Sequence, residues 1–266
     1  MPNFVVIRGG GDLASGVAIR LTRAEIRVVI AELKKPLAVR RTVSFAEAAY
    51  SKRIQIEEIS AIRVTKKENY FARNEIPLII DPELSSLKSL KPIVVVDARM
   101  LKRPPEVGRE IAPLVVGLGP GFTAGTDCHA VVETLRGHDL GRVSWKGSAA
   151  SDTSQPGSIV SYNVDRVLRA PAAGFLKPNA EIGQRLMKGD LIATVVDSEV
   201  RARFDGVLRG LIHPSVELTQ GMKIGDLDPR NDPSFCYRVS DKALAIGGGV
   251  LEALLTRPEV RRQLWT

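Results

Sequence analysis

A glycine-rich turn near the start of the chain offers the clearest chemistry, because it joins an apolar run to a helical pattern. Residues 5–7 predict a buried strand and residues 13–24 predict a helix. Gly9, Gly10 and Gly11 lie between them and, with an alanine three positions on, have the spacing of a dinucleotide-binding loop. Glycine lets the chain turn sharply and approach a phosphate, and the helix points its first N–H groups at an anion. The turn therefore predicts a nucleotide-type ligand; a turn that merely connects strand to helix is the alternative.

Charged residues close to this turn bear on the ligand in different ways. Glu32 follows the next expected strand, about twenty positions past the glycines, where a carboxylate would bind a ribose hydroxyl. Asp12 would repel a pyrophosphate unless it serves only to cap the helix. Asp97 and Arg99 follow another buried strand, and the carboxyl ends of parallel strands are where such folds bind ligands. All four are candidate ligand-binding residues.

A second glycine cluster follows the apolar residues 114–116. Gly119 and Gly121 in this cluster have no side chain, so their backbone can closely approach either a ligand or another segment of the chain. Both glycines are therefore further candidates for contact with the ligand.

Three side chains beyond this cluster could do acid–base or metal chemistry. Asp127, His129 and Glu133 have even spacings, so they share one face if the segment is a strand. His129 and Glu133 also share a face on a helix, at positions i and i+4. One imidazole and two carboxylates can bind a metal or act as acid and base. A hydrogen-bonded His–Glu pair beside a loop is the alternative.

The order of the expected elements indicates the fold. Short apolar strands alternate with helices, which is typical of a doubly wound sheet. The expected helices are residues 13–24, 45–52, 66–73 and 84–90, and the expected strands are residues 4–7, 27–31, 59–64, 78–80 and 93–96.

The second part of the chain has a different character. Residues 164–226 have regular turn signals and no helical pattern, and two halves of this stretch resemble a biotinyl/lipoyl-type barrel-sandwich module. The hairpin at residues 196–200 contains no lysine, so we expect no covalent biotin or lipoate. The expected fold is α/β, with an N-terminal Rossmann-like parallel sheet over residues 1–157 and a smaller all-β barrel-sandwich-like domain over residues 158–229. Residues 230–266 should form a helical segment that packs back on the first domain.

Composition excludes several classes of protein. The 266 residues carry a net charge of +8, but the basic residues are scattered as short pairs and aromatic residues make up only 5%, so we expect no nucleic-acid partner. No apolar run is long enough to cross a membrane. Two distant cysteines and the lack of a signal peptide favour the cytoplasm.

Taken together, the chain resembles the accessory protein of the selenium-dependent molybdenum hydroxylase system, the YqeB-type family. No single phrase is specific, but together they run from the first expected strand to the last helix. The matching phrases are residues 6–14, 40–45, 117–122, 127–134 and 245–252. The resemblance implies a cytoplasmic maturation factor that serves a molybdenum hydroxylase apoenzyme, and it assigns no reaction.

The expected function is therefore that of a maturation factor that binds a phosphate-bearing nucleotide or a molybdopterin-type dinucleotide. Asp127, His129 and Glu133 would hold a metal or the reacting group. An NAD(P)-dependent oxidoreductase and a non-catalytic nucleotide-sensing assembly module are the two alternatives. Catalysis, a bound metal and a homo-oligomeric state are left open.

Overall fold

The computed structural model describes residues 3–65, 72–86, 91–101, 103–106, 108–151 and 166–266. The chain forms two compact units. The first unit contains residues 1–34, 45–152 and 239–266, and the second contains residues 35–44 and 153–238. The last helical segment of the chain therefore belongs to the same unit as the glycine turn.

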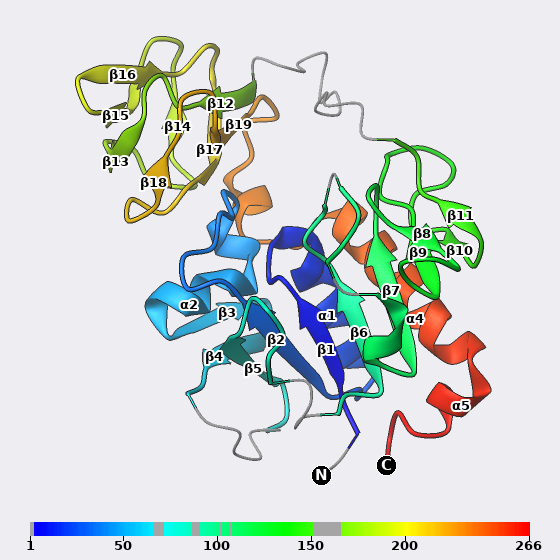
Figure 1. The fold of residues 1–266 in the computed structure, drawn as a ribbon. Helices are drawn as coiled ribbons and strands as arrows, with labels where there is room; N and C mark the ends of the chain where they lie inside the picture. Colours follow the sequence, from blue (N-terminus) through cyan, green and yellow to red (C-terminus); the bar gives the residue numbers. More distant parts are fainter. Residues whose placement is uncertain (1–2, 66–71, 87–90, 102, 107, 152–165) are drawn as a thin grey trace. The chain divides into compact units, whose positions relative to one another are not determined.

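The first unit is built on a nine-stranded sheet with the strand order β10-β9-β7-β6-β1-β2-β5-β4-β3 (Figure 1). Its central strands pair in parallel, whereas the hairpin β3–β4 and the pair β9–β10 are antiparallel. The strands are β1 (Val5–Arg8), β2 (Val28–Glu32), β3 (Arg53–Ile56), β4 (Ile59–Arg63), β5 (Glu75–Ile80), β6 (Val94–Asp97), β7 (Leu114–Leu118), β9 (Ala130–Val132) and β10 (Val143–Ser144). A separate two-stranded sheet pairs β8 (Thr123–Ala124) with β11 (Gly147–Ser148).

Two helices cover one face of this large sheet. Helix α1 (Asp12–Arg23) contacts β2, and helix α4 (Asp241–Thr256) contacts β7, β9 and β10 (Figure 1). The two helices pack against each other. Ser240 caps α4, because its side chain accepts a hydrogen bond from the Ala243 N–H at 3.2 Å. Shorter helical elements of this unit are η2 (Phe45–Glu47), α2 (Ala48–Ser51), η3 (Arg109–Ile111) and α5 (Pro258–Arg261).

Loops cover the opposite face of the sheet. Alternate residues of the central strands, such as Val6, Val95 and Val115, are buried there against Leu84 and Phe122. Among the described residues, the segments packed on this face are turns, short strands and the three-residue helical element η3. The expected helix at 66–73 lies mostly outside the described residues, as does the end of the expected helix at 84–90.

The fold class expected from the sequence, a Rossmann-like parallel sheet with a barrel-sandwich-like domain, is therefore wrong as stated. The large sheet is mixed, because antiparallel strands close both of its edges. Local patterns of buried apolar residues are the same in either direction of pairing, so they could not distinguish the edge hairpins from crossover connections.

The second unit contains two four-stranded antiparallel sheets, which only partly matches the expected barrel sandwich. The sheet orders are β12-β19-β17-β14 and β16-β15-β13-β18. The elements are η1 (Arg41–Val43), β12 (Val167–Arg169), β13 (Gly174–Pro178), β14 (Arg185–Leu186), β15 (Leu191–Val195), β16 (Ser198–Arg201), β17 (Gly206–Leu211), β18 (Glu217–Leu218), β19 (Lys223–Asp228) and η5 (Pro233–Cys236).

The hairpin between β15 and β16 is the place where a carrier domain would display its lysine. Here the chain turns at Val196 and Asp197, and Val196 has a positive φ of 55°. The side chain of Val196 is exposed. The expectation that this hairpin receives no biotin or lipoate stays a prediction.

Candidate functional site

The order of strands in the large sheet reverses between β1 and β6. From β1 the chain passes to β2, then to the edge hairpin β3–β4 and back inward to β5, all on one side of β1. It then crosses to β6, β7 and β9 on the other side. In open α/β sheets, ligands bind outside the carboxyl ends of the strands at such a reversal. The three glycines follow β1 at this point, and Arg99 follows β6, so the two loops come together at the carboxyl edge (Figure 1).

The first two glycines of the turn are held by the protein itself. Gly9 has a positive φ of 91°, a conformation that favours glycine. Gly10 donates its N–H to Oε2 of Glu32 at 2.6 Å, and its carbonyl accepts the Ala46 N–H at 2.8 Å. A Cβ on Gly10 would lie 2.9 Å from the backbone nitrogen of Ala46. These two glycines therefore serve the turn and the packing around it.

Gly11 is different, because it faces open space. It is the N-terminal cap of α1 with a φ of −62°, which any residue can adopt. No described atom lies within 4 Å of the position that its Cβ would occupy. The neighbouring Asp12 is the first residue of α1, and its Oδ1 accepts the N–H of the next residue, Leu13, at 3.0 Å. A ligand could therefore reach the first turn of α1 over Gly11.

Glu32 holds the turn rather than facing outward. Its side chain is buried, and its two oxygens accept N–H groups from Gly10 at 2.6 Å and Leu33 at 2.7 Å. Burial raises the pKa of Glu32 against the opposing effect of these hydrogen bonds. Both carboxylate oxygens are thus engaged, and the carboxylate is not displayed for a ribose.

Asp97 and Arg99 do come together, and they bring two residues that the sequence had not indicated. Arg99 donates from Nε to Oδ1 of Asp97 at 2.9 Å and from Nη2 to Oδ2 at 2.8 Å. Arg8, at the end of β1, is only 2% exposed, and its Nη1 lies 3.7 Å from Asp97. Glu106 lies 3.0 Å from Arg99. The sequence offered one signal for Arg8: it is an arginine at the end of an apolar strand, directly before the glycine turn.

The second glycine loop packs against the chain rather than facing open space. A Cβ on Gly119 would lie 2.6 Å from Oγ1 of Thr134, and a Cβ on Gly121 would lie 2.5 Å from the carbonyl oxygen of Leu101. Both glycines have a positive φ, of 74° and 94° respectively. The sequence left open whether these glycines approach a ligand or another segment of the chain, and in the structure they lie against another segment.

Asp127, His129 and Glu133 are not brought together. Strand β9 spans only Ala130–Val132, so His129 lies at its amino end and Glu133 at its carboxyl end. The four steps along the extended chain from His129 to Glu133 span about 13 Å, at about 3.3 Å per residue. Among the described residues, no group of three or more His, Cys, Asp and Glu side chains could hold a metal ion.

Each of these three side chains accepts backbone N–H groups. Asp127 accepts the Thr123 N–H at 2.9 Å, and His129 accepts the Val115 N–H with Nδ1 at 3.0 Å. Glu133 accepts N–H groups that include those of Thr134 and Leu135, each at 2.6 Å. Each of the three side chains thus satisfies backbone N–H groups, and His129 and Glu133 do not form the hydrogen-bonded pair that was the alternative.

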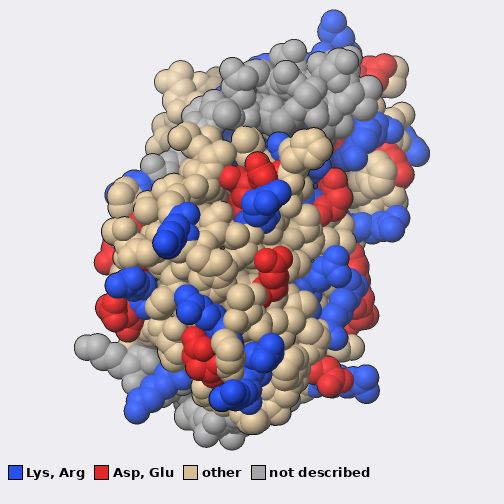
Figure 2. Space-filling view, turned by 90° about the vertical axis from the view of Figure 1, so that its right-hand side faces the viewer, with Lys and Arg blue, Asp and Glu red and all other residues tan. Residues whose placement is uncertain are grey.

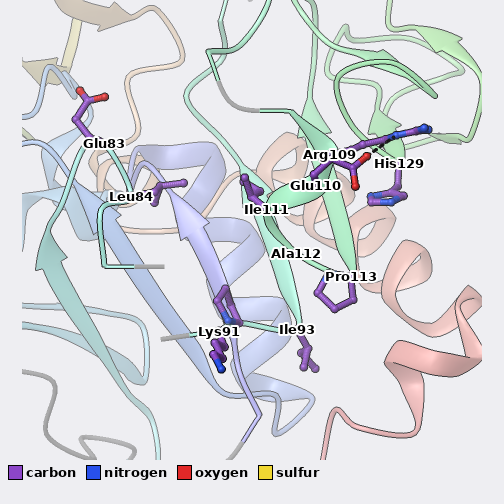
Figure 3. Close-up of a pocket in the computed structure, with 11 residues that line it drawn as sticks. Glu83, Leu84, Lys91, Ile93, Arg109, Glu110, Ile111, Ala112, Pro113 and His129 are labelled. Atoms are coloured by element: carbon purple, nitrogen blue, oxygen red, sulfur yellow. Dashed lines mark hydrogen bonds and ion pairs between the residues drawn. The ribbon is translucent and has the colours of Figure 1, made fainter. Parts of the chain in front are cut away.

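A pocket of about 830 Å³ lies away from the glycine turn, where the segments leading into β6, β7 and β9 meet. Ile93, Ile111 and Pro113 supply apolar lining, and Arg109 and His129 lie together at one end (Figure 3). Burial, followed by the charge of Arg109, lowers the pKa of His129, which favours the neutral imidazole. Since Nδ1 of His129 accepts a hydrogen bond, the neutral ring carries its proton on Nε2.

The net charge of +8 is not gathered into one area on the face shown in Figure 2, where basic and acidic side chains are interspersed. Among the described residues, none of the helices has the length and apolar character needed to cross a membrane.

These observations define an α/β protein with a mixed sheet. The carboxyl edge of that sheet carries a glycine turn and two arginines that share Asp97. Over 255 residues, 95% of its length, the chain is 45% identical to the uncharacterized protein YqeB of Escherichia coli (strain K12). Most of this chain is therefore related to YqeB, as the sequence phrases predicted. The chain spans about half, 47%, of that relative. No protein-family profile matches the chain.

Solved structures give only remote similarities. The ectoine utilization protein EutE (DoeB) from Ruegeria pomeroyi, in its apo form, aligns with 85% of this chain and 86% of its own at 11% identity and a TM-score of 0.27. An aspartoacylase family protein from Mesorhizobium loti aligns with 85% of each chain at 13% identity and a TM-score of 0.27. At these scores the alignments carry no argument about this chain.

Proposed function

We propose that this protein is an accessory factor for molybdenum hydroxylases that binds a phosphate-bearing nucleotide or pterin ligand at the carboxyl edge of its large sheet. The observation that carries the ligand proposal is the open space over Gly11 at the N-terminus of α1. It lies where the strand order reverses, and the N–H groups of the first helical turn favour an anion.

Two further features support an anionic ligand. Arg8 and Arg99 lie beside the glycine turn, and the Cβ that Gly9 lacks would be 3.5 Å from Cγ of Arg99. Guanidinium groups bind phosphate oxygens through several N–H donors in a fixed geometry. The molybdenum hydroxylase role itself rests on the phrases shared with the YqeB-type family.

The oxidoreductase alternative loses one of its three supports, which were Gly9, Gly11 and Glu32. Glu32 was expected to bind a ribose hydroxyl, and both oxygens of its carboxylate accept backbone N–H groups instead. We therefore retain ligand binding and delivery as the function and do not assign hydride transfer.

The ligand proposal is tested with Gly11→Val. We expect the variant to fold, because the added side chain enters open space, and to lose the ligand because it covers the first turn of α1. A ligand at one hundred times its dissociation constant should stabilise the wild-type protein by about 2.7 kcal/mol. Thermal shifts with a panel of mono- and dinucleotides and pterin phosphates measure this.

The control for that experiment is Gly248→Val, at a glycine of α4 that also has no described atom within 4 Å of its missing Cβ. This control should fold and respond to the same ligands as the wild type. Equal responses from the two variants, or no shift with any ligand at millimolar concentration, would refute the ligand proposal.

The accessory role predicts a complex with a molybdenum hydroxylase. We expect an affinity-tagged form of the protein, isolated from its own cells, to retain the apo form of a molybdenum hydroxylase more strongly than the cofactor-loaded form. Quantitative mass spectrometry of the eluates, with the tag alone as control, measures the ratio. Ligand binding without any retained hydroxylase would instead support the nucleotide-sensing alternative.

A further inference from the structure

At the carboxyl edge of the sheet, two arginines face only one carboxylate that the strands themselves supply. Arg8 and Arg99 each carry a positive charge, whereas Asp97 supplies a single carboxylate between them. Asp97 is itself held by Arg99 through both of its oxygens. Buried charges are costly unless they are paired, so the pair of guanidiniums requires a second anion.

Arg8 is the group most in need of that anion. Its Nε and Nη2 donate to the carbonyl oxygen of Pro82 at 3.0 Å and 2.6 Å. Its Nη1 is buried and has no hydrogen-bond partner among the described residues. Burial, and then the charge of Arg99, lower the pKa of Arg8 against the opposing effect of the Asp97, Glu106 and Glu83 carboxylates.

Glu106 supplies the second anion from outside the sheet. Its Oε2 lies 3.0 Å from both Nη1 and Nη2 of Arg99 and 3.7 Å from Nη1 of Arg8. A single oxygen thus occupies the point where three guanidinium nitrogens converge. Asp97 has a side chain only 8% exposed, whereas that of Glu106 is 46% exposed and lies in the loop after β6.

We propose that the Glu106 carboxylate is a stand-in for the ligand's anionic group, which displaces it to bind Arg8 and Arg99. The incoming oxygen takes the position of Oε2 and offers Nη1 of Arg8 the acceptor that it lacks. The displaced carboxylate moves to solvent, where it keeps Arg103, its exposed neighbour at 3.2 Å. The inference rests on the proposed function, and it identifies the ligand as one that carries an anionic oxygen group such as a phosphate.

The test compares the affinity of inorganic pyrophosphate for the wild-type protein and for Glu106→Gln by isothermal titration calorimetry. A carboxylate that fills the subsite nine-tenths of the time weakens the apparent affinity about tenfold. Removing its charge should therefore tighten binding by about that factor. The matched control is Glu110→Gln, in the same loop region, where Glu110 lies 3.3 Å from Arg109 and is well exposed. The control should bind pyrophosphate as the wild type does.

A second variant distinguishes the arginine subsite from other anion sites. Adding Arg99→Gln to Glu106→Gln leaves Arg8 paired with Asp97, so the charges remain balanced. This double variant should bind pyrophosphate at least tenfold more weakly than Glu106→Gln alone. Unchanged or weaker binding by Glu106→Gln, or no binding by any of the proteins, would overturn the inference.

The outcomes for the two proposals can be told apart. Nucleotide binding that depends on Gly11, together with no effect of Glu106→Gln, would leave the proposed function standing and refute the stand-in. Tighter pyrophosphate binding by Glu106→Gln, with no nucleotide or pterin bound by any form, would support the subsite and refute the proposed ligand class.

Discussion

Replacing Gly16 with valine should destabilise the first unit by about 3 kcal/mol or more. A Cβ on Gly16 would lie 2.5 Å from the carbonyl oxygen of Ala243, a backbone atom of α4. From the other side, a Cβ on Gly247 would lie 2.7 Å from the carbonyl oxygen of Gly16. The two helices cross at this point with backbone against backbone, so the added atoms must force them apart. Urea denaturation followed by circular dichroism measures the loss.

The control is Gly248→Ala on the same helix α4. No described atom lies within 4 Å of the missing Cβ of Gly248, and alanine is favoured over glycine inside a helix by about 1 kcal/mol. This variant should be at least as stable as the wild type. A Gly16→Val protein that unfolds at the same urea concentration as Gly248→Ala would show that the helices do not cross so closely.

Replacing Asp226 with asparagine should destabilise the second unit by about 3 kcal/mol, because it removes the buried negative charge that Arg166 and Arg209 share, although Asp228 remains 2.9 Å from Arg209. Asp226 is 1% exposed, and it lies 2.8 Å from Nη2 of Arg166. It also accepts Nε–H of Arg209 at 2.7 Å. Both arginine side chains are 9% exposed, so water cannot replace the lost charge. The free energy of unfolding from urea titration measures the effect.

An exposed ion pair of the same unit provides the comparison. Glu199 accepts Nε–H of Arg201 at 2.7 Å, but both side chains are 50% exposed. Glu199→Gln should therefore change the stability by less than about 1 kcal/mol. Similar losses for Glu199→Gln and Asp226→Asn would mean that burial does not set the strength of these pairs.

The sequence predicted the elements around the site well where the signal was local. Residues 13–24 were expected to be a helix and residues 230–266 to contain a helical segment, and the structure has α1 at Asp12–Arg23 and α4 at Asp241–Thr256. The glycine turn was placed between β1 and α1 by the same reasoning. These predictions succeed because a buried strand, a cap and a helical repeat each depend on neighbouring residues.

The direction of strand pairing and the partners of the charged side chains depend on residues far apart in the sequence, so the sequence did not predict them. The chain through β9 is extended, so His129 and Glu133 lie about 13 Å apart although their spacing allowed a shared face. Glu32 was expected to bind a ligand, and it binds the glycine turn. Even spacing identifies polar side chains that can share a face, whereas the backbone conformation between them decides whether they can touch.

The sequence by itself determined the position of the glycine turn, the two long helices, and the relation to YqeB through phrases spread along the chain. Only the tertiary structure decided that the large sheet is mixed, that Gly11 is the open glycine, and that Arg8 and Glu106 meet Asp97 and Arg99. The physical reason is the range of the interactions. Turns, caps and helical repeats act over a few residues, whereas strand order, burial and ion pairing join residues that are up to ninety-eight positions apart in this site, from Arg8 to Glu106.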